Sequence, residues 1–337
     1  MLAAVQSRAA TIDDVARAAG VSPATVSRVL NGTREVSPDR AERVRVAVAA
    51  LGYQPFGPAR ALRRQATDVW AVIVADIENP FFTSIVRGIE DGGREAGFRV
   101  MLCNSDEDLR KEADYVDVAI SERMAGVVIA VASTRASKLD PLLDAGIAVV
   151  AVDRRPGGGK VDCVLVDNDR GAAEATAHLI DAGSTRIACI TGPPRLSTAN
   201  ERLSGYRRAL RRAHIALDPS LVARTDFRET GGYKAMRELC SLPQPPGAVL
   251  VANNLMTVGA LEALRDEGLS VPGDVRVVGF DDAPWAKLLQ PSLTVVAQPT
   301  YEIGRRSAEL LLTARSQPAR PRQEVLLHPH LIVREST

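Results

Sequence analysis

The sequence predicts a small all-α domain at the N-terminus, followed by a larger α/β domain built as two lobes. Three observations support this fold class. A chain of 337 residues is too long for one hydrophobic core. Residues 11–52 hold three short helical patterns separated by Gly and Ser-Pro pairs. From Val69 onward, runs of Val, Ile and Ala alternate with helical patterns, which is typical of parallel sheets covered on both faces.

The charge of the chain is unevenly distributed. The whole sequence carries 42 Lys and Arg against 41 Asp and Glu, a net charge of +1. Residues 1–64 hold ten basic against five acidic side chains, whereas the remainder holds 32 against 36. A basic N-terminal domain on a mildly acidic body is typical of a small nucleic-acid-binding domain joined to a domain of another kind.

The sequence also argues against several classes of protein. The four cysteines contain no CxxC pair, and the four histidines show no metal-binding spacing. We therefore predict reduced thiols and neither a metal nor a cofactor. The first residues lack the apolar stretch of a signal peptide, and no run is long enough to span a membrane. We expect a cytoplasmic protein.

Capping signals divide the N-terminal segment into three helices. Thr11 and Asp14 resemble a capping box that opens the first helix, and Gly20 supplies the turn after it. Ser22-Pro23 and Ser37-Pro38 read as the starts of the second and third helices. Val26, Val29 and Leu30 form the inward face of the second helix, and the stripe of the third is Ala41, Val44, Val48 and Leu51. This arrangement predicts a helix-turn-helix.

The second helix is the predicted reader of the DNA major groove. Pro23, Ala24 and Arg28 would face base edges, with Arg28 suited to a bidentate contact with guanine. Thr25, Ser27 and Asn31 would bind phosphates. The alternative is a small helical domain with an exposed arginine. The predicted DNA-binding residues of this domain are Thr11, Ser22, Pro23, Ala24, Thr25, Ser27, Arg28 and Asn31.

Three stretches resemble the lactose repressor/galactose repressor family of bacterial transcription regulators: TIDDVARAAGVSPATVSRVLNG, VSPDRAERVRVAVAALGYQP and ARAL. The resemblance continues through the rest of the chain. It implies a hinge helix over 58–62, with Ala59 and Leu62 contacting DNA and Leu62 wedged into the minor groove at a central base step. So short a helix is marginal alone, so we expect it to order when two copies pair on DNA. A palindromic operator with a central CG is the expected site.

Ligands of open α/β sheets bind at the carboxyl ends of the strands. Polar or aromatic residues follow the predicted strands at Asp76 to Phe82, at Asp153-Arg154, at Asn253 and at Asp281-Asp282. The larger domain resembles periplasmic sugar-binding proteins, and more narrowly those that bind ribose. The resemblance implies a ligand-binding set of Asn79, Phe81, Phe82, Asp153, Arg154, Arg202, Phe227, Asn253, Asp281 and Gln298. The alternative for each alone is a core aromatic, a strand-end cap or a salt bridge. Asn254 departs from the Asp usual at its position, which puts one local hydrogen bond in doubt.

The chemistry of this set is that of a sugar site. Phenylalanine rings can stack on the apolar faces of a pyranose, while carboxylates, amides and guanidinium groups bond its hydroxyl rim. The predicted protein is thus a DNA-binding regulator, most simply a repressor, with a small monosaccharide as effector. Ribose or a close relative is expected, acting as inducer or as corepressor. The alternatives are a sugar-binding receptor or a sugar-processing enzyme with an incidental helical domain, but no nucleophile triad, metal site or dinucleotide fingerprint supports an enzyme.

The predicted partners are palindromic operator DNA, the monosaccharide and a second copy of the chain, with no membrane. A homodimer is expected because dimeric readers mirror the two-fold axis of their operator. The predicted boundaries are 9–56 for the helix-turn-helix domain, 57–67 for the hinge helix and linker, and 68–337 for the effector-binding and dimerisation domain.

Overall fold

The computed structural model describes residues 10–31, 36–53 and 67–337. The chain divides into two compact units, Met1–Thr67 and Asp68–Thr337. The predicted hinge helix, with Ala59 and Leu62, lies outside the described residues.

The N-terminal unit contains the three predicted helices, α1 (Ile12–Ala19), α2 (Pro23–Asn31) and α3 (Pro38–Leu51). The capping box of α1 is present: Thr11 Oγ1 accepts a hydrogen bond from Asp14 N, and Asp14 Oδ2 accepts one from Thr11 N. Gly20 ends this helix in the left-handed region, with φ of 62°, which glycine adopts without strain. The buried core of the unit is formed by Val15, Ala16, Ala19, Val26, Val44 and Ala47.

The predicted inward stripe of α3 is partly wrong. Val44 is buried as expected, but Ala47 takes the second buried position, and Leu51 is 41% exposed. The reason is length. α1 and α2 have 8 and 9 residues, whereas α3 has 14, so the last turn of α3 extends past the core that the two shorter helices provide.

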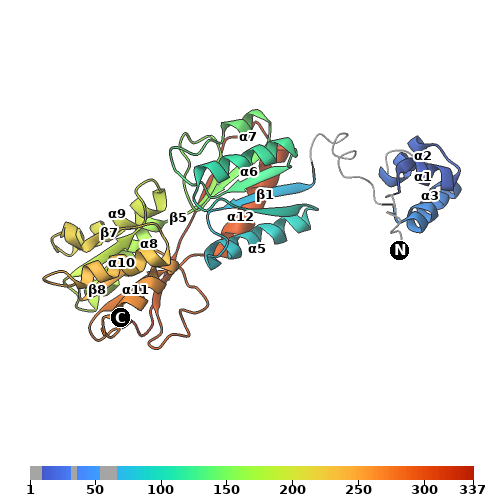
Figure 1. Ribbon diagram of the computed structural model, residues 1–337. Coiled ribbons are helices and arrows are strands. Elements are labelled where there is room, and N and C mark those ends of the chain that lie inside the picture. The colour runs from blue at the N-terminus through green and yellow to red at the C-terminus, as the bar shows by residue number, and fades with distance from the viewer. Residues whose placement is uncertain (1–9, 32–35, 54–66) are drawn as a thin grey trace. The chain divides into compact units, whose positions relative to one another are not determined.

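The first lobe of the larger unit is a parallel six-stranded sheet with the order β11-β5-β4-β3-β1-β2. Its strands are β1 (Val69–Val74), β2 (Arg99–Asn104), β3 (Gly126–Ile129), β4 (Ala148–Val152), β5 (Asp162–Val166) and β11 (Glu324–Leu327). Its helices are α5 (Pro80–Glu95), α6 (Leu109–Ser121), α7 (Asp140–Asp144) and α12 (Thr300–Ser316). α5 and α12 lie side by side on one face, and α6 and α7 pack on the other (Figure 1).

The second lobe repeats this plan with the order β12-β10-β9-β8-β6-β7. Its strands are β6 (Ile187–Thr191), β7 (Val222–Arg224), β8 (Ala248–Val251), β9 (Arg276–Phe280), β10 (Thr294–Ala297) and β12 (His330–Ile332). Its helices are α8 (Asn168–Asp181), α9 (Ser197–Arg212), α10 (Glu229–Cys240) and α11 (Asn254–Asp266), with a short 3-10 turn at Pro219–Leu221. Only β12, among the described strands of this sheet, runs antiparallel.

The predicted two-lobed α/β class is therefore confirmed, and each strand run with the near-continuous Val, Ile and Ala pattern forms a strand. The sequence analysis did not single out β7, β10, β11 and β12. Each has only 3 or 4 residues, and β7, β11 and β12 lie at sheet edges, so their residues are only partly buried and give a weak apolar signal.

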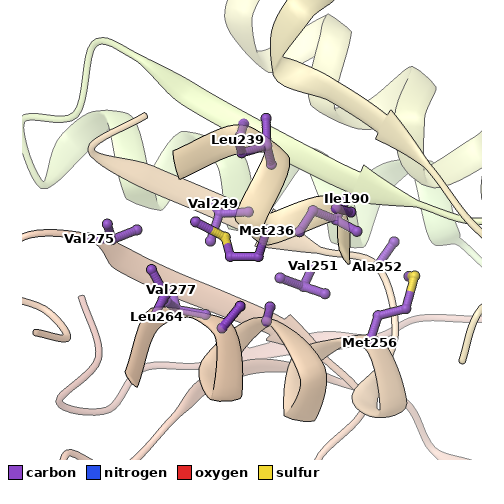
Figure 2. Packing of buried hydrophobic residues seen from close by; sticks show 14 of the residues in the cluster. Ile190, Met236, Leu239, Val249, Val251, Ala252, Met256, Leu264, Val275 and Val277 are labelled. Carbon is purple, nitrogen blue, oxygen red and sulfur yellow. The ribbon is translucent and has the colours of Figure 1, made fainter. Parts of the chain in front are cut away.

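Both faces of each sheet are buried, which explains the continuous apolar strands. In β1, Trp70 and Val72 pack towards α5 and α12, while Ala71 and Ile73 pack towards α6 and α7. In the second lobe, one face of the sheet packs on α10 and α11, where Met236 and Met256 fill the space between helix and sheet (Figure 2). The opposite face packs on α8 and α9.

The chain crosses between the lobes three times: from β5 to α8, from β10 to α12, and from β11 to β12. The carboxyl ends of the strands in both sheets therefore border the same region between the lobes. In the part of the chain that the structure describes, no helix has both the length and the apolar character needed to cross a membrane.

Candidate functional site

The exposed face of α2 presents the side chains predicted to contact DNA. Ser22, Pro23, Ala24 and Arg28 are exposed, whereas Thr25 and Ser27 are half-buried. Within the described residues, Arg28 has no hydrogen bond or ion pair, so its guanidinium group is free to bind another molecule.

Some of the polar side chains predicted to contact DNA also cap the helices α1 and α2. Ser22 Oγ accepts a hydrogen bond from Thr25 N at 3.2 Å and lies 3.0 Å from Thr25 Oγ1, so both hydroxyl groups help to start α2. Thr11 likewise caps α1 and is half-buried. The side chain of Asn31, like Ala59 and Leu62, lies outside the described part of the chain.

A second site lies at the carboxyl ends of the strands in the larger unit. A cavity lies between loops from both lobes. Its wall contains every residue of the predicted ligand-binding set: Asn79, Phe81, Phe82, Asp153, Arg154, Arg202, Phe227, Asn253, Asp281 and Gln298. All of these residues are less than 10% exposed. The structure thus brings together side chains that are up to 219 positions apart in the sequence.

Three phenylalanine rings, together with Leu255, supply the apolar part of the wall. Phe81 and Phe82 meet edge to face, with ring centroids 5.0 Å apart, and both also pack in the core beneath α5. Phe227 lies in the loop after β7 with φ of 62°, a conformation that a bulky residue rarely adopts. A Cβ on Gly192 would lie 2.3 Å from the Phe227 ring, so only glycine leaves room for this ring position.

Asp153 and Arg154 follow β4 and form the polar wall of the first lobe. Arg154 donates to Val131 O at 3.1 Å and to Glu107 Oε1 at 2.6 Å, and its Nε lies 3.2 Å from Asp153 Oδ2. Burial raises the pKa of Asp153 to about 6, although Arg154 and Arg202 oppose the shift. Asp153 has a φ of 63°, in the left-handed region that non-glycine residues rarely adopt.

Asp281, Gln298 and Arg202 form the corresponding wall of the second lobe. Asp281 follows β9 with φ of 73°, and its Oδ1 accepts a hydrogen bond of 2.5 Å from Gln298 Nε2. Arg202, on α9, donates to Asn168 Oδ1 and to Ala252 O. Its guanidinium carbon lies 3.9 Å from the centroid of the Phe280 ring. Burial raises the pKa of Asp281 and lowers that of Arg202.

Two of the predicted amide ligands also cap helices. Asn79 Oδ1 accepts from Phe81 N at 3.0 Å and caps α5. Asn253 Oδ1 accepts from Met256 N at 2.9 Å and caps α11, while its Nδ2 donates to Phe227 O at 3.0 Å. Asn253 thus has one amide hydrogen left to donate to a ligand, whereas an Asn side chain without other contacts could donate two hydrogen bonds and also accept through its oxygen.

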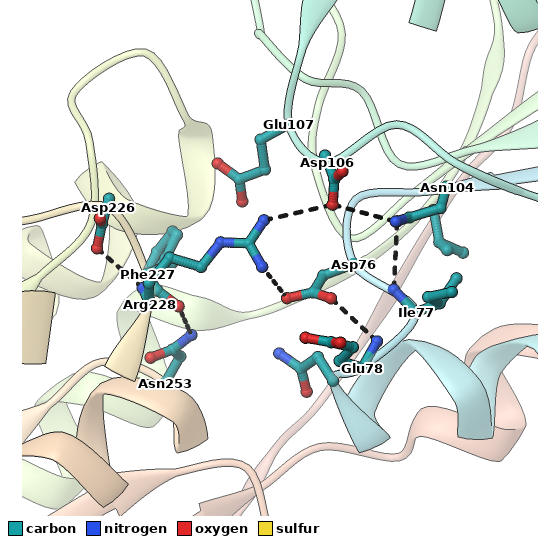
Figure 3. A network of polar contacts seen from close by, with 12 residues as sticks. Asp76, Ile77, Glu78, Asn104, Asp106, Glu107, Asp226, Phe227, Arg228 and Asn253 are labelled. Carbon is teal, nitrogen blue, oxygen red and sulfur yellow. Dashed lines mark hydrogen bonds and ion pairs between the residues drawn. The ribbon is translucent and has the colours of Figure 1, made fainter. Parts of the chain in front are cut away.

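The wall contains further residues that the sequence analysis did not include in the ligand-binding set: Asp76, Glu107, Thr198, Arg228 and Leu255. Asp76 has a signal in the sequence, because it follows the apolar run of β1. Glu107 and Arg228 lie in loops without a periodic pattern, and no motif identifies them. Figure 3 shows Arg228 reaching from the loop after Phe227 towards Asp76 and Asp106 of the first lobe.

Asn254, whose local hydrogen bond the sequence left in doubt, bonds across the lobes. Its Nδ2 donates to Asn79 Oδ1 at 2.9 Å, and both side chains are buried. Its Oδ1 has no hydrogen-bond partner among the described residues, and the same is true of Arg154 Nε and Gln298 Oε1. Buried polar atoms without partners are rare in native structures. Arg154 and Gln298 line the cavity, so their unpartnered atoms leave capacity to bond a polar ligand there.

The cavity combines aromatic faces with carboxylates, amides and guanidinium groups, which is the chemistry that binds a small polyhydroxylated molecule. In the described parts of the chain, no group of three His, Cys, Asp or Glu side chains is placed to hold a metal ion.

Comparison with known proteins identifies a family for each of the two units. The family described as bacterial regulatory proteins, lacI family, matches residues 11–55, and the periplasmic binding protein-like domain matches residues 176–337. The ribose operon repressor of Escherichia coli (strain K12) is 36% identical over 328 residues, which cover 97% of this chain and 99% of the relative.

Two solved structures show the same fold over nearly the whole chain. One is the complex of the transcriptional regulator CelR with cellobiose, which is 36% identical with a TM-score of 0.75, covering 97% of this chain and 100% of that one. The other is the lac repressor dimer bound to operator and the anti-inducer ONPF, which is 26% identical with a TM-score of 0.84, covering 98% and 99%. The chain belongs to the lacI family of bacterial regulatory proteins.

Proposed function

We propose that this protein is a transcriptional regulator whose affinity for a palindromic operator is changed by a monosaccharide bound in the cavity, with ribose as the first candidate. One observation carries this proposal: the same chain holds the exposed helix α2, whose Arg28 has no partner among the described residues, and a buried cavity lined by aromatic and polar side chains. A binding role is favoured over catalysis because the relatives are named as a repressor and as regulators.

The proposed DNA contacts are those of the exposed α2 face. Arg28 would read a guanine in the major groove, and Pro23 and Ala24 would lie against base edges. Leu62 would enter the minor groove at a central CG step, where an apolar wedge unstacks the bases. The similar lac repressor is a dimer on its operator, which supports a homodimer here.

The proposed sugar contacts divide between stacking and hydrogen bonding. Phe81, Phe82 and Phe227 would cover the ring faces, and Asp153 and Asp281 would each accept hydrogen bonds from hydroxyl groups. The two carboxylates disfavour a phosphate on the ligand, because like charges repel strongly in a site removed from solvent. The name of the ribose operon repressor, at 36% identity, supports ribose over other pentoses.

The cavity offers a physical route for regulation because both lobes contribute to its wall. A ligand that contacts both lobes favours one arrangement of the lobes over another, and only such a difference in affinity can shift an equilibrium. A coupling of about 1–3 kcal/mol would be typical. Ribose that lowers operator affinity would be an inducer, and ribose that raises it would be a corepressor.

The test combines calorimetry with a gel shift. The purified protein is titrated with D-ribose, other pentoses, hexoses and polyols, and operator affinity is then measured with and without the sugar that binds best. We expect micromolar binding of ribose and a change in operator affinity. Operator affinity that stays the same when sugar demonstrably saturates the cavity would contradict the regulatory coupling. Binding of a different sugar would leave the proposed regulatory coupling in place and would identify that sugar, and not ribose, as the effector.

A further inference from the structure

Arg228 and two carboxylates close the mouth of the cavity across the two lobes. Arg228 NH1 lies 2.5 Å from Asp76 Oδ2, and its NH2 lies 3.8 Å from Asp106 Oδ1. Asp76 and Asp106 belong to loops of the first lobe, whereas Arg228 precedes α10 of the second. Arg228 and Asp76 both line the cavity, and the Arg228 side chain is 34% exposed whereas that of Asp76 is only 8% exposed.

The three side chains are held in place by their own loops (Figure 3). Asp226 Oδ1 accepts from Arg228 N at 3.0 Å, and Asn253 Nδ2 holds the carbonyl group of the preceding residue. Asp76 Oδ1 accepts from Glu78 N at 3.0 Å. Asp106 accepts from Asn104 Nδ2 and from Lys111 Nζ, and its pKa is lowered chiefly by the hydrogen bond from Lys111. These carboxylates thus offer fixed negative charge to Arg228.

A second ion pair between the lobes lies beside the Arg228–Asp76 pair. Arg195 NH2 of the second lobe lies 3.1 Å from Glu107 Oε2 of the first, while Glu107 Oε1 accepts from the buried Arg154. Exposure rises outward along this chain of charges, from 4% for the Arg154 side chain through 11% for Glu107 to 47% for Arg195. Positive side chains of the second lobe therefore meet negative side chains of the first along the mouth of the cavity.

We propose that Arg228, paired with Asp76 and Asp106 across the mouth of the cavity, restricts the site to an unextended monosaccharide. This inference rests on the proposed sugar-binding function and sets the class of its ligand. A group attached to the sugar and passing through the mouth would have to displace the Arg228 guanidinium and leave the largely buried Asp76 carboxylate without its partner. An unpaired buried charge is strongly unfavourable. The similar CelR–cellobiose complex contains a disaccharide, so the overall fold alone does not set this limit.

The test compares D-ribose with ribose carrying one added group. Calorimetric titrations use D-ribose, methyl β-D-ribopyranoside and uridine with the wild-type protein, Arg228→Ala and Asp76→Asn. Asp76→Asn removes the negative charge but keeps a side-chain oxygen that can accept the hydrogen bond from Glu78 N. Arg237→Ala is the matched control, because Arg237 pairs with Glu267 on the surface of the same lobe and does not line the cavity.

We expect wild-type protein and Arg237→Ala to bind ribose and neither extended ligand. Arg228→Ala and Asp76→Asn should bind at least one extended ligand about tenfold or more tightly than wild type does, a change of about 1.4 kcal/mol. Wild-type protein that binds the extended ligands as tightly as ribose would overturn the inference and leave the proposed function standing. The inference is also overturned, with the proposed function still standing, if Arg228→Ala and Asp76→Asn both fold and bind neither extended ligand more tightly than wild type does. Wild-type protein that binds no sugar of any kind would overturn the proposed function and this inference with it.

Discussion

Asn254 Nδ2 donates a hydrogen bond to Asn79 Oδ1 over 2.9 Å, which joins the start of α11 in the second lobe to the start of α5 in the first. Both side chains are buried beside the cavity. Asn79 Oδ1 also accepts from Phe81 N, so one amide oxygen connects a helix cap, a cavity phenylalanine and the other lobe. The position of Phe81 is therefore coupled to the contact between the lobes.

Replacing the donor in this hydrogen bond should weaken the contact between the lobes. In Asn254→Asp, a carboxylate would face the Asn79 oxygen, and neither group can donate. We expect the free energy of unfolding at pH 7.5 to fall by about 1–3 kcal/mol, and sugar affinity to fall with it. Urea denaturation and calorimetry measure the two effects.

The pH dependence of this variant separates the lost hydrogen bond from a general defect. A buried carboxyl group facing an oxygen has a raised pKa in the folded protein, so the folded state binds a proton more readily than the unfolded state. Stability lost at pH 7.5 should then return as the pH falls, because the protonated group can donate. Gln244→Glu is the control, since this exposed amide side chain makes no hydrogen bond among the described residues. Equal losses at all pH values would contradict this explanation.

Arg28→Ala should change how operator sequence is read. A bidentate contact from arginine to guanine contributes about 1–3 kcal/mol, so the free energy of operator binding should weaken by that amount for each half-site and specificity should relax at one base pair in each half-site. Binding to a library of operator variants measures both effects. Arg45→Ala removes an exposed arginine that pairs with Glu42 on α3, and it should leave base preference unchanged. The same relaxation in both variants would argue against Arg28 as a reader of base edges.

Phe227→Ala should weaken sugar binding while operator binding without sugar is kept. A stacked aromatic ring contributes about 0.5–1.5 kcal/mol beyond the apolar area that it covers, so the sugar Kd should rise about tenfold or more. The matched control is Phe98→Ala, because Phe98 stacks on Trp70 at 4.7 Å within the first lobe and does not line the cavity. Phe98→Ala should lower the free energy of unfolding and leave the affinity for the sugar unchanged. Parallel losses of sugar and operator binding in Phe227→Ala would contradict separate sites.

Much of the fold was predictable because its signals are local. Helix caps such as Thr11 with Asp14 act over three residues, and both faces of the central strands are buried, so their apolar runs are continuous. The end of α3 was not predictable in this way. Whether Leu51 is covered depends on the lengths of the two other helices, which the periodicity of α3 does not contain.

The cavity was predictable in its residue types and less so in their connections. Strand ends and a family resemblance named the ligand-binding set, and the structure places it around one cavity. Neither the strand ends nor the family resemblance showed that Asn253 already forms hydrogen bonds as a helix cap. They also did not show that Arg228 pairs with Asp76, 152 positions away. Such pairs depend on how two loops from different lobes meet, and no local pattern encodes that.

Asp153→Asn should raise stability and lower sugar affinity in the same protein. Burial raises the pKa of Asp153 to about 6 from its ordinary value near 3.8. Because the folded pKa lies above the unfolded one, this group favours folding most below pH 4, and that contribution is lost as the pH rises through about 6. At pH 7.5 the buried carboxylate destabilises the protein, so the uncharged amide should increase the free energy of unfolding, with a smaller difference at pH 4.

Sugar binding should show the opposite trend, because hydroxyl groups donate to the carboxylate and stabilise its ionised form. Wild-type affinity should therefore rise between pH 5 and pH 7, with release of a proton on binding that calorimetry in two buffers detects. Asp153→Asn should show smaller effects, which come from Asp281, because burial also raises the pKa of that cavity carboxyl group. Asp218→Asn is the control for stability, since a hydrogen bond from Ser220 lowers the pKa of Asp218 and reverses the sign of its pH dependence. Wild-type sugar affinity that is constant from pH 5 to pH 7 would mean that the Asp153 carboxylate does not accept hydrogen bonds from the ligand.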